Sequence, residues 1–182
     1  MKRGQPVLGA KEIFRGAVKD VASSATVLRE PDGRVAGVVI VQSVDFFNSV
    51  YHLVTPGPPE GGHYDNPRVA KLDLPSKSTI QGYVSGRFIV SLEQDWAAGG
   101  FKEGDLIDFD LTAVKASPAK LRGSLVLRPS SSQSIEQVAT TRDRLLVALY
   151  ENVKGQVLSF ARATGKWTSS RLALPAHVQL EL

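Results

Sequence analysis

The segment Leu72-Asp73-Leu74-Pro75 has two counterparts further along the chain, and this repetition decides the fold. The counterparts are Leu125-Val126-Leu127-Arg128-Pro129 and Leu172-Ala173-Leu174-Pro175, so the three closing prolines stand about 50 residues apart. Self-similarity at a period of tens of residues is the mark of a repeat architecture. The segment between successive prolines is therefore the repeating unit.

Each repeated unit contains short segments that are typical of strands. The apolar runs are too short and too rich in β-branched residues for buried helices, and Gly, Asp or Asn stand close to them. Other segments alternate with a period of two, which turns one face toward a core. The apolar runs are residues 38–41, 88–90 and 145–149, and the alternating segments are residues 49–54, 69–74 and 106–111. Residues 111–120 are predicted to form at most a helical turn.

Short strands in units of roughly 40 to 50 residues predict an all-β chain, a β-propeller sector of about three four-stranded antiparallel blades. We assign residues 21–75, 76–129 and 130–175 to the blades, with partial strands at each end: 1–20, the outer edge of a preceding blade, and 176–182, the start of the next. Because a closed propeller has four to eight blades, the whole chain, 1–182, is expected to be part of a larger propeller domain. A β-sandwich is the alternative, but it leaves the repeated proline unexplained.

The composition is that of a packed globular protein. The 182 residues are 42% hydrophobic and 22% charged. The net charge is +4, but basic and acidic residues alternate, as in Arg142-Asp143-Arg144, so nucleic-acid binding is not expected. Cysteine is absent, which excludes disulfides, thiolate metal sites and a cysteine nucleophile and fits a reducing compartment such as the cytoplasm. No run approaches the ~18 apolar residues of a membrane helix, so no membrane partner is expected.

Two motifs carry a family resemblance. Residues 94–100 read Gln-Asp-Trp-Ala-Ala-Gly-Gly, and residues 104–110 read Gly-Asp-Leu-Ile-Asp-Phe-Asp. With these motifs, and with residues 45–49, 141–146 and 151–153, the chain resembles the N-terminal propeller domain of bacterial prolyl oligopeptidase-like serine peptidases. The resemblance covers most of the chain. It implies a seven-bladed propeller that caps an α/β-hydrolase domain, which holds the catalytic Ser, Asp and His, and that restricts entry to short peptides.

The sequence assigns no catalytic, cofactor-binding or metal-binding residue, and no cofactor is expected. Gly82-Tyr83-Val84-Ser85-Gly86 has the residue types of a nucleophile elbow, but the serine is one place late and no helical pattern follows. We interpret it as a turn entering the Phe88 strand. His52, His63 and His177 stand alone, without the spacing of a metal site, which favours structural or solvated histidines.

Three further features allow two readings each. Asp105, Asp108 and Asp110 could bind calcium, but the full loop pattern is absent and a half-exposed strand is the better account. Phe46, Phe47 and Trp96 could line a peptide-binding face or pack between blades; packing is favoured for the phenylalanines, and Trp96 is left open. The Gly- and Pro-rich loop from Thr55 to Pro67 could meet a partner or be a simple hairpin tip.

Two functions follow from these observations. The first is a non-catalytic propeller cap of a serine peptidase, whose partners are a peptide substrate and the α/β-hydrolase domain of the parent protein. The second is a free-standing propeller-like module that presents loops to a protein partner. Under either function, this chain alone is not expected to be an enzyme. Unpaired sheet edges are templates for association, so self-association of the isolated chain is also predicted.

Overall fold

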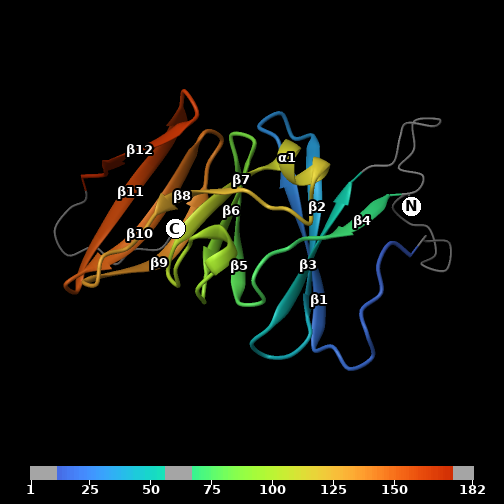
Figure 1. The fold of residues 1–182 in the computed structure, drawn as a ribbon. Coiled ribbons are helices and arrows are strands. Elements are labelled where there is room, and N and C mark those ends of the chain that lie inside the picture. The colour runs from blue at the N-terminus through green and yellow to red at the C-terminus, as the bar shows by residue number, and fades with distance from the viewer. Residues whose placement is uncertain (1–11, 56–66, 174–182) are drawn as a thin grey trace, which may run out of the picture.

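The computed structural model describes residues 12–55 and 67–173, which form three four-stranded antiparallel sheets (Figure 1). The first sheet contains β1 (Ala22–Arg29), β2 (Val35–Ser43), β3 (Ser49–Thr55) and β4 (Arg68–Lys71). The second contains β5 (Ser78–Val84), β6 (Arg87–Leu92), β7 (Leu106–Asp110) and β8 (Gly123–Leu127). The third contains β9 (Gln133–Thr140), β10 (Arg144–Glu151), β11 (Lys154–Ala163) and β12 (Lys166–Arg171). The predicted all-β propeller sector with three four-stranded antiparallel blades is confirmed.

The three sheets lie next to one another in chain order, from the first sheet, which begins in blue, to the orange and red third sheet (Figure 1). Within each sheet the strands are hydrogen-bonded in chain order. Strand β5 contacts both β1 and β9, so the first strands of neighbouring sheets lie next to each other. In a propeller the sheets are arranged radially around a central channel. The three first strands are therefore the inner strands of this sector.

The hydrophobic core lies between adjacent sheets. One cluster joins the first sheet to the second, and a smaller one joins the second to the third. Strand β6 contributes to both, because Phe88 and Val90 belong to the first cluster and Ile89 to the second. Successive side chains of a strand point to opposite faces. A sheet that is covered on both faces therefore needs the continuous apolar run found at residues 88–90.

Local turn chemistry closes the hairpins as the sequence indicates. Ser85 and Gly86 form the two-residue connection from β5 to β6, with φ angles of 52° and 75°. Positive φ at both central residues is the geometry of a type I′ turn, whose twist matches that of the two flanking strands. The predicted helical turn is α1 (Leu111–Ala116), which begins where the Asp110 carboxylate accepts hydrogen bonds from the amides of Thr112 and Ala113. No helix in the described segments could cross a membrane.

The predictions for the ends of the chain remain predictions. Residues 12–20 contain no strand. They lie beside the first sheet, where the ring of Phe14 packs at 4.8 Å from the ring of His52 and the Asp20 carboxylate accepts a hydrogen bond from the Gln42 amide. The predicted start of a next blade at 176–182, the third closing proline and most of the 55–67 loop lie outside the described residues.

Candidate functional site

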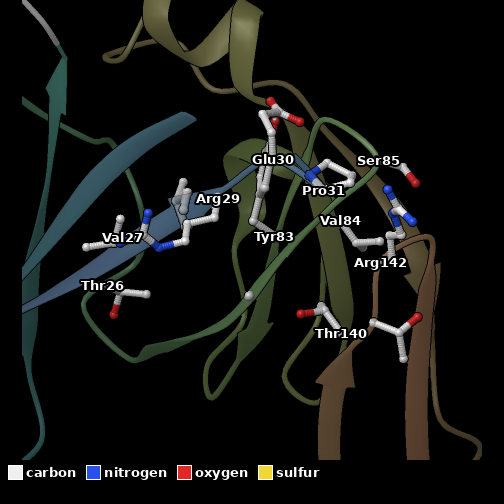
Figure 2. A pocket seen from close by; sticks show the side chains of 13 residues that line it. Thr26, Val27, Arg29, Glu30, Pro31, Tyr83, Val84, Ser85, Thr140 and Arg142 are labelled. Atoms are coloured by element: carbon white, nitrogen blue, oxygen red, sulfur yellow. Dashed lines mark hydrogen bonds between the residues drawn. The ribbon is translucent and has the colours of Figure 1, made fainter. Parts of the chain in front are cut away.

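A pocket of about 650 Å³ lies at the end of the sector where β1, β5 and β9 finish (Figure 2). Its lining comes from the last residues of these three strands and from the turns that follow them: residues 26–31, 82–85 and 140–142. Each inner strand thus contributes one wall. The pocket is called the axial pocket below, because inner strands surround the axis of a propeller.

Gly82 allows two walls of the axial pocket to approach closely. It stands at an irregularity in the β5–β6 pairing and has a φ of 149°, a conformation that side-chain-bearing residues rarely adopt. A Cβ atom at this position would lie 3.0 Å from Cγ2 of Thr140, which is on β9. Gly82 therefore satisfies a backbone requirement and a spacing requirement between the second and third sheets.

A hydrogen bond joins the β5 wall of the pocket to the β1 wall. The Tyr83 hydroxyl, at the end of β5, donates to Oε1 of Glu30 at 2.5 Å, just after β1. Both side chains are labelled in Figure 2. Burial raises the pKa of Tyr83, and the hydrogen bond to the Glu30 carboxylate raises it further. The phenol therefore stays protonated over a wider pH range than an ordinary tyrosine, and the bond holds the first two sheets together at the pocket.

Two arginines bring positive charge to the axial pocket. Arg29 donates from Nη1 to the carbonyl oxygen of Gly33 at 3.1 Å. Arg142 is exposed on the turn after β9, and its side chain is labelled in Figure 2. Ser85, Thr26 and Thr140 add hydroxyl groups to the lining. These cations and hydroxyl groups can donate hydrogen bonds to carbonyl or carboxylate oxygens.

Those residues singled out from the sequence that the structure describes are not brought together into a reactive centre. Gly82 to Gly86 is the end of β5 and its turn, as predicted from the sequence. His52 lies on β3, with Nε2 at 2.9 Å from the Gln42 side-chain oxygen. Burial and the nearby Lys71 lower its pKa. His63 and His177 lie outside the described residues.

Two of the three aspartates share an arginine. Arg87 donates to the carboxylates of Asp108 and Asp110, and Asp110 also caps α1. Asp105 is paired with Arg128. In the described segments, no group of three potential metal-ligating side chains is found. The expectation of a half-exposed strand is wrong for Asp105 and Asp108, both 0% exposed. Because the middle sheet is covered on both faces, arginines rather than water neutralise these carboxylates.

The aromatic predictions are partly wrong. Phe46 and Phe47 are 86% and 77% exposed, so they do not pack between blades. They lie on the β2–β3 turn, beyond the last paired residues of the two strands, Ser43 and Ser49. Trp96 packs against the first core cluster, with its ring 5.9 Å from the Phe101 ring and 6.0 Å from the Phe109 ring.

Sequence reasoning missed the contacts that fix the sheets around the axis. Arg87 donates two hydrogen bonds to the buried Asp108 carboxylate, at 2.8 and 2.9 Å. From the third sheet, Trp167 donates from Nε1 to the same carboxylate at 2.7 Å, and Arg162 Nε lies 3.7 Å from it. The Tyr51 hydroxyl similarly donates to the Ser78 carbonyl, from the first sheet to the second. The sequence does contain a signal for the buried ion pair, because Arg87 and Asp108 stand in otherwise largely apolar strands.

Comparison with curated proteins finds two peptidases, and no protein-family model matches the chain. The chain is 36% identical over 185 residues to an uncharacterized peptidase of Sinorhizobium fredii, an alignment that covers 100% of this chain and 25% of that protein. It is 25% identical over 170 residues to an uncharacterized peptidase of Rickettsia prowazekii, covering 92% of this chain and 23% of that protein. The chain thus spans about a quarter of the length of these relatives.

Comparison with solved structures also finds peptidases. A post-proline cleaving enzyme from Rickettsia typhi superimposes with a TM-score of 0.80 at 26% identity, over 96% of this chain and 25% of that one. A prolyl endopeptidase superimposes with a TM-score of 0.54 at 22% identity, over 84% of this chain and 20% of that one, a likeness of fold alone. These matches confirm the resemblance stated from the sequence.

Proposed function

This chain is a sector of a β-propeller of the prolyl oligopeptidase family, and from that premise we propose that it is part of a non-catalytic cap. The cap restricts the access of peptides to an α/β-hydrolase domain of the parent protein, which supplies the serine, aspartate and histidine. The parent is then a serine peptidase, and the hydrolase domain and the peptide substrate are the two partners. The chain itself contributes shape and charge to the route of entry.

The observation that carries this proposal is the position of the axial pocket. Its walls are the ends of three consecutive inner strands, and in a complete propeller the inner strands surround the central channel. The pocket is then one part of the channel mouth. A mouth bordered by close-packed strands admits an extended peptide more readily than a folded chain, because an extended chain is narrow and a domain is not. Selection by size needs no reactive group in this chain.

A chimera, in which this chain replaces the matching part of a related peptidase, tests the proposal. The alignment with the Sinorhizobium fredii peptidase covers the whole chain, so the chain can replace the matching quarter of that protein. Thr26 lines the axial pocket and is exposed, so Thr26→Trp narrows the mouth. In the chimera, we expect this substitution to slow cleavage of a long proline-containing peptide more than cleavage of a short one.

A matched control separates narrowing of the mouth from a general effect of the new tryptophan. Thr168 is exposed on β12, the outermost strand of the third sheet, so Thr168→Trp adds the same side chain far from the inner strands. It should leave the ratio of long to short peptide cleavage unchanged. Equal effects of the two substitutions, or peptide cleavage by the 182-residue chain alone, would contradict the cap role.

The second candidate is a free-standing interaction module, and the exposed Phe46 and Phe47 favour it because exposed aromatic residues are frequent contacts in protein interfaces. The natural reading frame distinguishes the two functions. A frame that encodes this chain together with a nucleophile elbow, followed by Asp and His, supports the cap. A frame with further blades and no hydrolase supports the module.

Self-association of the isolated chain is a further proposal. Within the described segments, each sheet has two edge strands: β1 and β4 in the first, β5 and β8 in the second, and β9 and β12 in the third. Such strands pair readily with other chains. Sedimentation velocity over a wide concentration range should therefore detect dimers or larger species, and a strictly monomeric chain contradicts the proposal.

A further inference from the structure

A second and larger hollow lies toward the opposite end of the inner strands. It has a volume of about 1040 Å³ and is lined by residues 133–138 of β9, the end of β6 and the β2–β3 turn. Strand β9 lies at the inner edge of its sheet, so an extended segment can lie along its free side. We call this hollow the rim groove, after the turn that borders it.

Phe46 and Phe47 form an ordered apolar edge of the rim groove. They are 86% and 77% exposed. Their turn is held by the Asp45 carboxylate, which accepts hydrogen bonds from the amides of Phe47 and Asn48 at 2.8 and 2.7 Å. Ser76 in turn donates to the Asn48 side chain at 2.8 Å. Two large aromatic rings on a fixed turn lose little conformational freedom on binding, which makes them effective contact residues.

The charge of the rim groove is opposite to that of the whole chain. Glu93, Glu103 and Glu136 line it, whereas the described residues contribute one cation to the lining, Lys77. All four side chains are exposed. The ion pairs found in the described residues include none of these glutamates. Glu93 and Glu136 accept hydrogen bonds from the neutral hydroxyl groups of Thr79 and Ser134, which leave their negative charge available to a ligand.

We propose that the rim groove binds an extended peptide segment in which a lysine or arginine stands next to an apolar side chain. The apolar side chain packs on Phe46 and Phe47, and the cation lies among Glu93, Glu103 and Glu136. Charge complementarity selects this occupant, because an acidic segment would meet three like charges. Binding requires only this chain, so it can be tested whether or not the cap role is correct.

The test is calorimetric titration of the 182-residue chain with a blocked pentapeptide, acetyl-Gly-Leu-Lys-Leu-Gly-amide. We expect saturable binding that weakens with added salt, since exposed charges are screened. The matched peptide with Glu in place of Lys should bind at least about tenfold more weakly. Equal binding of both peptides, or no binding of either at millimolar concentration, overturns the proposal.

Variants of the chain locate the binding. Phe46→Ser with Phe47→Ser should weaken binding about tenfold, and so should Glu93→Gln with Glu103→Gln and Glu136→Gln. Lys77→Gln should strengthen it, a gain that misfolding cannot imitate. Val18→Ser, at a fully exposed apolar residue outside the groove lining, should have no effect. Peptide binding that none of the groove variants changes overturns the assignment.

Another outcome would identify a different occupant. If the rim groove is instead covered by a second copy of this chain, the wild type will dimerise and the double phenylalanine variant will be monomeric in sedimentation. In that case the peptide will also compete with dimerisation. This result would replace the peptide proposal with a homodimer interface.

Discussion

The indole Nε1 of Trp167 donates a hydrogen bond to Oδ2 of Asp108 across 2.7 Å, from the third sheet into the second. The two residues are 59 positions apart in the chain. Asp108 is fully buried and also accepts two hydrogen bonds from Arg87 within its own sheet. Because removing one partner of a buried ion pair leaves an uncompensated charge, this cluster makes the boundary between the two sheets sensitive to single substitutions.

Asp108→Ala should therefore destabilise the fold strongly. The substitution leaves Arg87 buried without its main partner, and we expect a loss of about 3 to 5 kcal/mol in the free energy of unfolding. Urea unfolding followed by circular dichroism measures it. Asp143→Ala removes an aspartate whose side chain is 73% exposed and should leave the urea midpoint unchanged. A similar small effect of both substitutions would show that the cluster does not hold the sheets together.

Gly82→Ala should also destabilise the fold, for a reason of backbone conformation. The φ of 149° disfavours any side chain, and the new Cβ would lie 3.0 Å from Thr140 Cγ2. We expect a loss of about 1 to 3 kcal/mol in the free energy of unfolding, measured by urea unfolding. The control is Gly37→Ala in β2, where a Cβ would meet its nearest neighbour, Leu53 Cδ1, at an ordinary 3.4 Å. Equal losses would argue against a special role for Gly82.

Tyr83 predicts a pH dependence at alkaline pH. Its pKa is raised above the ordinary value of 10.0, first by burial and then by the bond to Glu30. Stability from the protonated phenol is therefore fully present below the unfolded pKa and is lost as the pH rises toward the folded value. Tyr83→Phe should cost about 1 to 2 kcal/mol near neutral pH, and its difference from wild type should narrow above about pH 10.

The measurement is the free energy of unfolding of both proteins at several values of pH. Tyr51, whose pKa is also raised by burial, is present in both proteins and cancels in the comparison. A difference between wild type and Tyr83→Phe that stays constant through alkaline pH would mean that the phenol does not titrate as the structure indicates.

The sequence predicted the sheets well because a repeat averages out local errors. Three units with the same order of strands and turns specify four-stranded blades even when one strand, such as β4, is shorter than its alternating segment. The two-residue turn at Ser85 and Gly86 could be predicted as well, since turn chemistry is local. The division into sheets thus depends on features within about 50 residues of each other.

The side-chain roles were harder to predict, because they depend on contacts between sheets. The alternation around Asp108 looks half-exposed until the third sheet covers it, and its partners come from residues 21 and 59 positions away. Phe46 and Phe47 look like core residues by hydrophobicity alone, but their exposure depends on what lies beside the β2–β3 turn. Periodicity carries no information about the neighbours of a turn.

Arg128 and Asp105 predict a pH dependence at the acid end of the range. Arg128 donates to both carboxylate oxygens of the fully buried Asp105, at 2.7 and 2.6 Å, and the Lys102 amide donates at 2.8 Å. Burial opposes ionisation of Asp105, but these hydrogen bonds outweigh it and hold its pKa below the ordinary 3.8. Ionised Asp105 therefore stabilises the fold above that value, and this stability is lost as the pH falls through the folded pKa.

Arg128→Gln should remove most of this effect. The variant should be less stable than the wild type near neutral pH, and the difference should shrink as the pH falls through the lowered pKa of folded Asp105, because both proteins then carry a protonated Asp105. Urea unfolding at neutral and acid pH measures the two differences. Arg122→Gln, at an exposed arginine just before β8, should match the wild type throughout. If the Arg128 variant loses the same stability at both values of pH, its role is packing rather than pairing with an ionised carboxylate.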